Sequence, residues 1–415
     1  MNIFALIIIY SLLLDYLLNL VADILNLRML SGEIPTEFSD VYDPETYRRS
    51  QDYTRVKTLF GLFASSASLA ALFGFWFLGG FNSLDIFVRS WHLHLILTGI
   101  VYIALLMLIR EVFSLPFSIV NTFVIEERFG FNRTKPATFI ADLLKGFALA
   151  ALLGGPLLAA VLAFFEYTGT YAWLYGWIVA ALFTLAIQFV APAWILPIFN
   201  KFKPLEEGDL KTGILDYARS VDFPIAGVSV IDGSRRSSKS NAFFTGFGRN
   251  KRIALFDTLM ANHTVPEMIA VLAHEIGHYK KKHVIQGMIA SILHAGIMFF
   301  LLSLFLGNGK LFQAFSMEHI SIYAGLVFFG LLYTPVELIL SLLLNLLSRH
   351  NEYQADRFAA QTITEPSAMV KALKSLAAHN LSNLRPHPFH VFLNYSHPPL
   401  LERVRAIETR MKDEG

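Results

Sequence analysis

The chain has 415 residues, of which 54% are hydrophobic and 16% are charged, and its mean hydropathy is +0.50. A soluble globular protein carries about 25% charged residues, so this composition is typical of a protein that crosses the membrane several times. The net charge is only +2 and no basic block alternates with stacking aromatics, which argues against a nucleic-acid partner. The absence of cysteine excludes disulfides, thiolate metal sites and cysteine nucleophiles.

Seven apolar runs are long enough to cross a bilayer, which takes about 20 residues per helix. One or two could be core helices of a large soluble protein, but seven in a chain so poor in charge indicate membrane spans. The first run lacks a basic n-region and a small-residue cleavage site, so we interpret it as uncleaved. The expected spans lie near residues 3–27, 58–80, 93–112, 143–165, 171–194, 284–306 and 321–347.

The connections between these spans alternate in their content of Lys and Arg. The first and third connections carry five each, whereas the second has only Arg89. Residues 195–283 carry thirteen, and the connection between the last two spans has only Lys310. Because basic residues favour the cytoplasmic side, the N-terminus is expected outside and the C-terminus in the cytosol. Both large polar regions, 195–283 and 348–415, then lie on the cytosolic side.

Three acidic residues fall inside expected spans: Asp15, Asp23 and Glu337. Charges at that depth usually face a bundle interior or a wet cavity. They are consistent with a polar chamber or a transport path, and equally with hydrogen bonds between helices or snorkelling near a span end. The connection at 114–132 mixes aromatic and charged residues, and we expect a structural amphipathic segment against the membrane face.

Residues 226–258 are expected to form a small β-sheet. The candidate strands are Gly227–Ile231, Ser240–Phe247 and Arg252–Phe256. The glycines here do not make a phosphate-binding loop, because no G-x-x-x-x-G-K follows a strand. A sheet edge can bind an extended peptide by strand addition, although a plain hairpin explains the pattern equally well.

The most informative motif is His274-Glu-Ile-Gly-His278. It lies in an expected helix that begins at a capping box, Thr264-Val-Pro-Glu267. Residues four apart share a helix face, so His274 and His278 can bind one metal ion. Glu275 is placed to take a proton from zinc-bound water.

Three lysines, Lys280–Lys282, follow the motif and indicate the membrane surface, where span six begins. They more readily anchor that span than bind substrate. His283 and His294 lie off the ligand register of the motif, so we interpret both as structural.

A catalytic zinc site needs a third protein ligand. Glu352 lies where span seven enters the cytosol, and Asp356, four residues on, is placed to accept the N–H of a ligating imidazole. Two other residues are weaker candidates for the third ligand: His350 lies off this face, and Glu337 is about 22 Å along the helix. The expected zinc ligands are therefore His274, His278 and Glu352.

These motifs together resemble the type I CAAX prenyl protease family, the seven-span zinc endopeptidases that process prenylated a-factor and prelamin A in eukaryotes. The shorter heat-shock membrane metalloproteases share the zinc motifs but have fewer spans. Site-2-type proteases match less well because their metal helix lies within the bilayer. The resemblance covers nearly the whole chain and is carried by Glu45–Ser50, Phe123–Phe131, Ser240–Phe247, His274–His278, Asn351–Asp356 and Asn394–Arg403.

The resemblance implies a mainly α polytopic fold. Seven helices would surround a water-filled chamber, capped by a cytosolic gluzincin-type zinc protease domain that contains the small sheet. It also implies that Glu352 is the third zinc ligand, and that His397 and Arg403 reach the site to assist the substrate or the oxyanion. Asn241 and Ala242 would line the substrate strand. From the residues alone, His397 would be a turn residue and Arg403 a solvated helix charge.

Four segments follow from this interpretation. Residues 1–194 hold spans one to five and their cytosolic connections, and 284–347 hold spans six and seven. Residues 195–283 form a cytosolic catalytic segment with the sheet and the motif helix. Residues 348–415 form a cytosolic C-terminal segment with the third zinc ligand.

We therefore expect an integral-membrane zinc metalloendopeptidase with one Zn2+ per chain, which removes the C-terminal tripeptide from prenylated CAAX proteins. The alternatives are a membrane-protein quality-control protease without prenyl specificity and a transporter with structural zinc. The expected partners are a peptide or protein substrate, possibly prenylated, and the lipid bilayer, with the chain acting as a monomer. The short connection between spans six and seven and the lack of an endoplasmic-reticulum retrieval tail favour a bacterial inner membrane.

Overall fold

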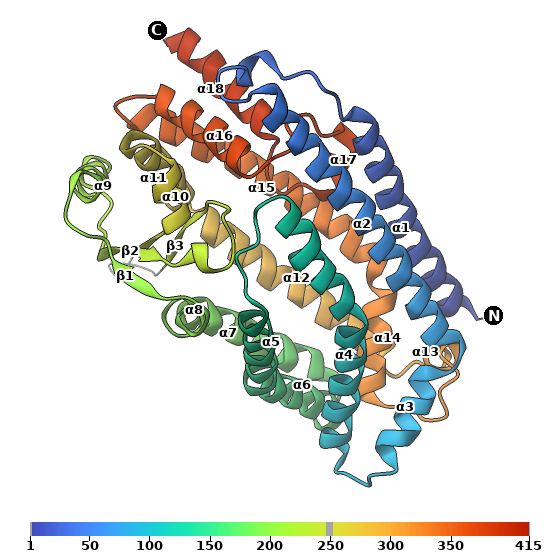
Figure 1. Cartoon of the computed structure of the whole chain (residues 1–415). Coiled ribbons are helices and arrows are strands. Elements are labelled where there is room, and N and C mark those ends of the chain that lie inside the picture. The colour runs from blue at the N-terminus through green and yellow to red at the C-terminus, as the bar shows by residue number, and fades with distance from the viewer. Residues whose placement is uncertain (1, 246–251, 415) are drawn as a thin grey trace.

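The computed structural model describes residues 2–245 and 252–414. The described part is mainly helical and contains one small sheet, which lies with α9, α10 and α11 on one side of the molecule, whereas α3 and α13 lie at the opposite end (Figure 1). The N-terminal helices are α1 (Ile3–Met29), α2 (Pro44–Phe77), α3 (Gly80–Arg89), α4 (Leu95–Val120), α5 (Pro136–Leu149), α6 (Gly155–Tyr167), α7 (Ala172–Val190) and α8 (Leu196–Phe199). The remaining helices are α9 (Asp209–Ser220), α10 (Asp257–Asn262), α11 (Val265–Lys280), α12 (His283–Phe305), α13 (Gly309–Ala314), α14 (Ile322–Leu332), α15 (Thr334–Thr362), α16 (Ser367–His379), α17 (Pro388–Asn394) and α18 (Leu400–Glu414).

Six helical segments in the described residues are long and apolar enough to cross a membrane. A seventh span results if α14 and α15, which meet at a 56° bend around Tyr333, are counted as one. Pro335 follows this break, in the first turn of α15, where its missing N–H costs no helix hydrogen bond. This arrangement agrees with the expected mainly α polytopic fold.

The helices extend beyond several expected spans. α2 begins at Pro44, well before the apolar run at 58–80, because Asp43 caps its N-terminus by accepting the backbone N–H groups of Glu45 and Thr46. Residues 114–126 do not form a separate amphipathic segment, so that expectation was wrong. They continue α4 through Pro116 into a π-helical turn, η2 (Asn121–Glu126). Similar π turns, η3 (Ala150–Gly154) and η5 (Ala191–Ile195), join α5 to α6 and α7 to α8.

The sheet has four strands in the order β1-β2-β4-β3. Their bounds are β1 Phe202–Pro204, β2 Gly227–Ile231, β3 Ala242–Thr245 and β4 Arg252–Phe256. β2 and β4 are parallel, and β3 runs antiparallel to β4 at an edge of the sheet. Gly246 and Phe247, with which the expected strand ended, lie outside the described residues. β1 was not predicted from the sequence, since three residues that include Lys203 and Pro204 show no strand alternation.

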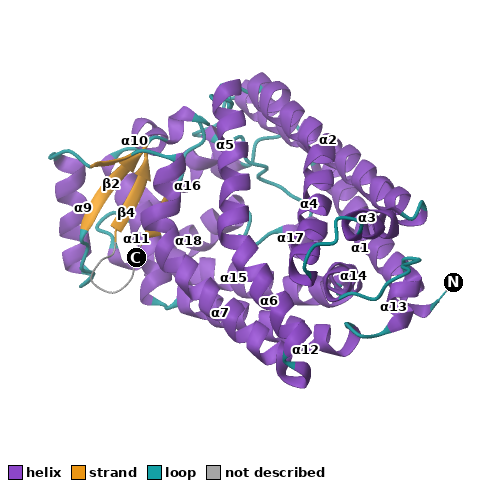
Figure 2. Ribbon diagram, turned by 90° about the horizontal axis from the view of Figure 1, so that it is seen from below, coloured by secondary structure: helices purple, strands orange, loops and turns teal. Residues whose placement is uncertain are grey.

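Two large apolar cores stabilise the molecule. One packs the sheet against α9, α11, α16 and α18, and Figure 2 shows the sheet beside α9 and α11 at the edge of the helical body. The other lies at the far end of the bundle and is rich in aromatic rings, including Phe315, which stacks on Phe328 at 3.9 Å and on Trp76 at 4.3 Å between ring centroids. The candidate metal ligands lie beside the first core.

Candidate active site

The motif helix α11 begins at the expected capping box. Glu267 accepts a hydrogen bond from the backbone N–H of Thr264 at 2.9 Å, which satisfies a donor that the first helical turn leaves free. The helix then buries Leu272, Ala273 and Ile276 in the core. The histidines of the motif lie on the face turned toward α15.

Gly277 allows α11 and α15 to cross closely. A Cβ atom at this position would lie 3.1 Å from both the Cα and the carbonyl oxygen of Ala355. A side chain would therefore push the two helices apart. The glycine inside the motif thus brings the C-terminal part of α15 within reach of both histidines.

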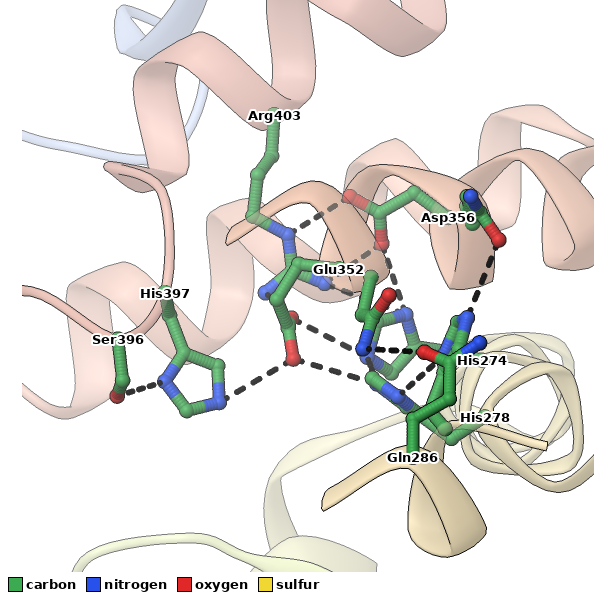
Figure 3. Close-up of polar contacts among 11 residues, drawn as sticks. His274, His278, Gln286, Glu352, Asp356, Ser396, His397 and Arg403 are labelled. Carbon is green, nitrogen blue, oxygen red and sulfur yellow. Dashed lines mark hydrogen bonds and ion pairs between the residues drawn. The ribbon is translucent and has the colours of Figure 1, made fainter. Parts of the chain in front are cut away.

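The structure brings His274, His278 and Glu352 together, with one ligand atom from each within 4.8 Å of the others. The Nε2 atoms of the two imidazoles lie 3.1 Å apart. Glu352 Oε2 is 3.4 Å from His274 Nε2, and Oε1 is 3.2 Å from His278 Nε2 (Figure 3). Glu352 Oε2 is buried without a hydrogen-bond partner in the described part of the chain. A buried carboxylate whose two oxygens each face one imidazole Nε2 fits a divalent cation, and this N/N/O set is one that zinc uses in catalytic sites.

Asp356 and Arg403 surround this group. Asp356 Oδ1 lies 2.8 Å from His274 Nδ1, where it can accept the imidazole N–H. Arg403 is buried and donates to both carboxylate oxygens of Asp356, from Nε at 2.8 Å and Nη2 at 2.6 Å (Figure 3). Its Nη1 lies 3.3 Å from Glu352 Oε2. Arg403 is therefore not the solvated helix charge that the residues alone suggested.

His397 approaches from the loop before α18. Its Nε2 lies 3.2 Å from Glu352 Oε1, and its side chain is 63% exposed. The hydroxyl of Ser396 lies 2.9 Å from His397 Nδ1. When the hydroxyl donates to Nδ1, the proton of the neutral ring is on Nε2, which then faces the site as a donor.

A cavity of about 440 Å³ opens over the group and includes Glu275 in its lining. Asn241 and Ala242, at the start of the edge strand β3, line the same cavity. Its apolar lining consists of Leu259, Val271, Met369, Leu373, Leu376 and Leu400. The structure thus places every residue expected at the site around or directly beside one cavity.

Lys239, in the segment that leads into β3, contacts residues of the membrane helices and their connection. Lys239 Nζ lies 3.0 Å from Glu126 Oε2 and 2.7 Å from the hydroxyl of Tyr53. The ammonium also lies 4.4 Å from the ring centroid of Phe131, close enough for a cation–π contact. These contacts hold the chain two residues before Asn241.

Burial and hydrogen bonding change the pKa of two groups at the site. Burial lowers the pKa of His274, but hydrogen bonds to Asp356 and Glu352 outweigh burial and raise that pKa to about 9. Burial raises the pKa of Glu275 above its usual 4.5. A carboxylate with a raised pKa is a stronger base, which suits proton transfer near neutral pH.

His283 was expected to be structural, but it contacts a member of the group. Its Nδ1 lies 3.0 Å from His278 Nδ1. Simple helical spacing places these residues on different faces. The structure brings them together because α11 ends at Lys280 and Lys282 takes a left-handed conformation with φ 62°. No sequence signal for this break was present beyond the run of lysines.

The weaker candidates for the third ligand lie elsewhere. Glu337 pairs with His294 at 2.9 Å between Oε2 and Nε2, and His350 contacts Gln354. Of the other expected intramembrane acids, Asp23 lies 3.3 Å from His390 Nδ1. Asp15 accepts from Asn19 on its own helix.

A helical membrane bundle that carries a His–His–Glu group beside a further carboxylate defines an integral-membrane metallopeptidase. A family model described as CAAX prenyl protease N-terminal, five membrane helices, matches residues 23–201, and the model of peptidase family M48 matches residues 204–411. The chain is 34% identical to CAAX prenyl protease 1 of Saccharomyces cerevisiae, over 92% of this chain and 90% of that protein. It is 33% identical to the CAAX prenyl protease 1 homolog of Homo sapiens, over 91% and 89% respectively.

The fold also matches a solved structure, the crystal structure of S. mikatae Ste24p, with a TM-score of 0.93 and 32% identity over 98% of this chain and 100% of that chain. The chain belongs to the CAAX prenyl protease family, and it is a multi-pass membrane metalloprotease. The comparisons thus identify an enzyme, and the alternative of a transporter with structural zinc is not supported. These relatives are eukaryotic, so the comparisons give no support to a bacterial inner membrane.

Proposed function

We propose that this enzyme is a zinc endopeptidase that removes the C-terminal tripeptide from prenylated CAAX-type proteins. The observation that carries the chemistry is the His274, His278 and Glu352 group beside the carboxylate of Glu275 in one cavity. The relatives named CAAX prenyl protease 1 support the substrate class.

One Zn2+ per chain would be held by His274, His278 and Glu352. Zinc bound there supplies Lewis acidity, which activates water and polarises a scissile carbonyl. Asp356 accepts the Nδ1–H of His274, which fixes that proton on Nδ1 and leaves Nε2 as the nitrogen directed toward the zinc position. Arg403 holds Asp356 in place and offsets part of the negative charge of Glu352 through Nη1.

The chain's own residues perform the proton transfers. Glu275 takes a proton from the attacking water and passes it to the leaving amine. His397 presents Nε2–H to the negative charge that develops on the carbonyl oxygen, because Ser396 holds its other ring nitrogen. No covalent bond between enzyme and substrate forms in this reaction.

The substrate would bind in an extended conformation along β3. β3 is an edge strand, so its backbone groups on the side away from β4 can pair with a peptide. The pairing would start at Asn241 and Ala242. The apolar lining of the cavity suits the aliphatic residues of a CAAX sequence. Strand addition there would place the scissile bond over the candidate metal ligands.

The proposed orientation follows from the basic connections. Segments 195–283 and 348–415 carry the site on the cytosolic side, and segments 1–194 and 284–347 hold the spans. All groups of the site come from one chain, so we propose that a monomer is active. We also propose that the water-filled chamber implied by the resemblance receives the substrate.

Cleavage of matched peptides tests the substrate class. The purified full chain is expected to cut a farnesylated CAAX peptide, to lose this activity with a chelator, and to cut the same peptide without the prenyl group far more slowly. Equal rates on both peptides would replace the proposal with the quality-control protease, which uses the same chemistry without prenyl specificity.

A further inference from the structure

The contact between His278 and His283 has a defined direction. Two imidazole nitrogens share a hydrogen bond only when one carries a proton and the other a lone pair. His278 directs Nε2 toward the candidate metal position, 3.1 Å from His274 Nε2 and 3.2 Å from Glu352 Oε1. A nitrogen that binds a metal carries no proton, so the proton of neutral His278 is on Nδ1. His278 Nδ1–H therefore donates to His283 Nδ1 across 3.0 Å.

This direction determines the tautomers of the residues beyond His278. Because His283 accepts at Nδ1, its own proton is on Nε2, which lies 3.2 Å from Oε1 of Gln354. The amide nitrogen of Gln354 lies 2.7 Å from His350 Nε2 and donates to it. Each of these three hydrogen bonds has one donor and one acceptor. They therefore form a continuous relay of hydrogen bonds from His278 to the exposed His350.

The backbone around His283 is built to make this contact. His283 is 6% exposed and follows Lys282, whose φ of 62° is rare for a residue with a side chain. This break between α11 and α12 returns His283 to the side of His278, five residues earlier. Gln354 and His350 come from α15, the same helix that carries Glu352.

We propose that His283 is a positioning residue that accepts the Nδ1–H of His278 and holds its Nε2 toward the metal. The proposal deepens the proposed function and rests on it. The two imidazoles of the site then use different outer acceptors: a carboxylate, Asp356, for His274, and a neutral imidazole for His278. Loss of such an outer partner typically weakens metal binding by about 10–100-fold.

Zinc affinity of the purified full-length protein in detergent, measured by competition with a chromophoric chelator, tests this role. His283→Leu removes the acceptor and is expected to weaken zinc binding about 10–100-fold. His283→Asn places an amide oxygen close to the former Nδ1 and is expected to stay within about threefold of the unaltered protein. Equal weakening by both variants would indicate packing alone and would overturn the proposal.

His278→Ala separates this proposal from the metal site itself. If His278→Ala binds zinc as tightly as the unaltered protein, the proposed metal site is wrong. If it loses zinc while His283→Leu retains full affinity, only the positioning role is wrong. Thermal unfolding of the zinc-free proteins checks folding. Where His283→Leu does not fold, Gln354→Leu removes the acceptor of His283 Nε2–H instead, and unchanged zinc affinity in that variant would overturn the relay.

Discussion

Glu275 is the residue on which proton transfer in the proposed reaction depends. Replacing it by Gln keeps its size but removes the base, so peptide hydrolysis is expected to fall by about 10²–10⁴-fold, the contribution typical of a general base. Zinc content should not change, because Glu275 is not in the group that could hold the metal. A fluorogenic peptide assay with elemental analysis checks both. Exposed Glu206→Gln is the matched control, and full activity in Glu275→Gln would remove this residue from the mechanism.

The raised pKa of His274, about 9, predicts a pH-dependent metal affinity. Below that pH the metal-free imidazole carries a proton, which zinc must displace. Zinc affinity is therefore expected to rise by about tenfold per pH unit from pH 6 to 8 and to level off above the pKa. Chelator competition at several pH values measures the slope, and an affinity independent of pH over this range would contradict it.

Most of the site was predictable from sequence because its residues lie on two helices at spacings of four. His274 and His278 share a face of α11, and Glu352 and Asp356 share a face of α15. The contact of His283 with His278 was not predictable, because it depends on the break between α11 and α12. Helical spacing assumes a continuous helix. For Arg403 the resemblance indicated proximity to the site, but its burial against Asp356 required the fold.

At the scale of elements, the crossing of α11 and α15 determines whether the ligands meet. Gly277→Ala is expected to destabilise the protein by about 1–3 kcal/mol through overpacking, because its Cβ would meet the backbone of Ala355 at 3.1 Å. Zinc affinity should fall with it as the helices separate. Gly287→Ala is the control, because nothing lies within 4 Å of its Cβ and better helix propensity should stabilise it slightly. A Gly277→Ala protein with a raised Tm and full zinc affinity would contradict this role.

Apolar runs predicted where the candidate spans lie, because a helix that crosses a bilayer needs about 20 consecutive, mostly apolar residues. Composition did not predict where the helices end. α2 continues into its polar N-terminal extension because Asp43 caps it there, and α4 continues through Pro116 into η2. The bend at Tyr333 was also missed, since a proline in the first turn of α15 interrupts no apolar run.

At the scale of the whole molecule, the proposed orientation places Glu206 in the cytosol and Lys310 on the opposite side. The chain contains no cysteine, so single Glu206→Cys and Lys310→Cys variants each carry one thiol. A membrane-impermeant maleimide is expected to label the first only from the cytosolic side of sealed vesicles and the second only from the other side. Labelling of both from one side would contradict the orientation.

In the proposed function, residues from two distant parts of the chain hold one catalytic zinc ion. α11 supplies His274 and His278, and α15 supplies Glu352, which lies 74 residues beyond His278 in the sequence. Anomalous diffraction at the zinc absorption edge from crystals of the full chain tests this most directly. One peak per chain is expected between these three side chains. A zinc peak elsewhere, with none at this position, would contradict it.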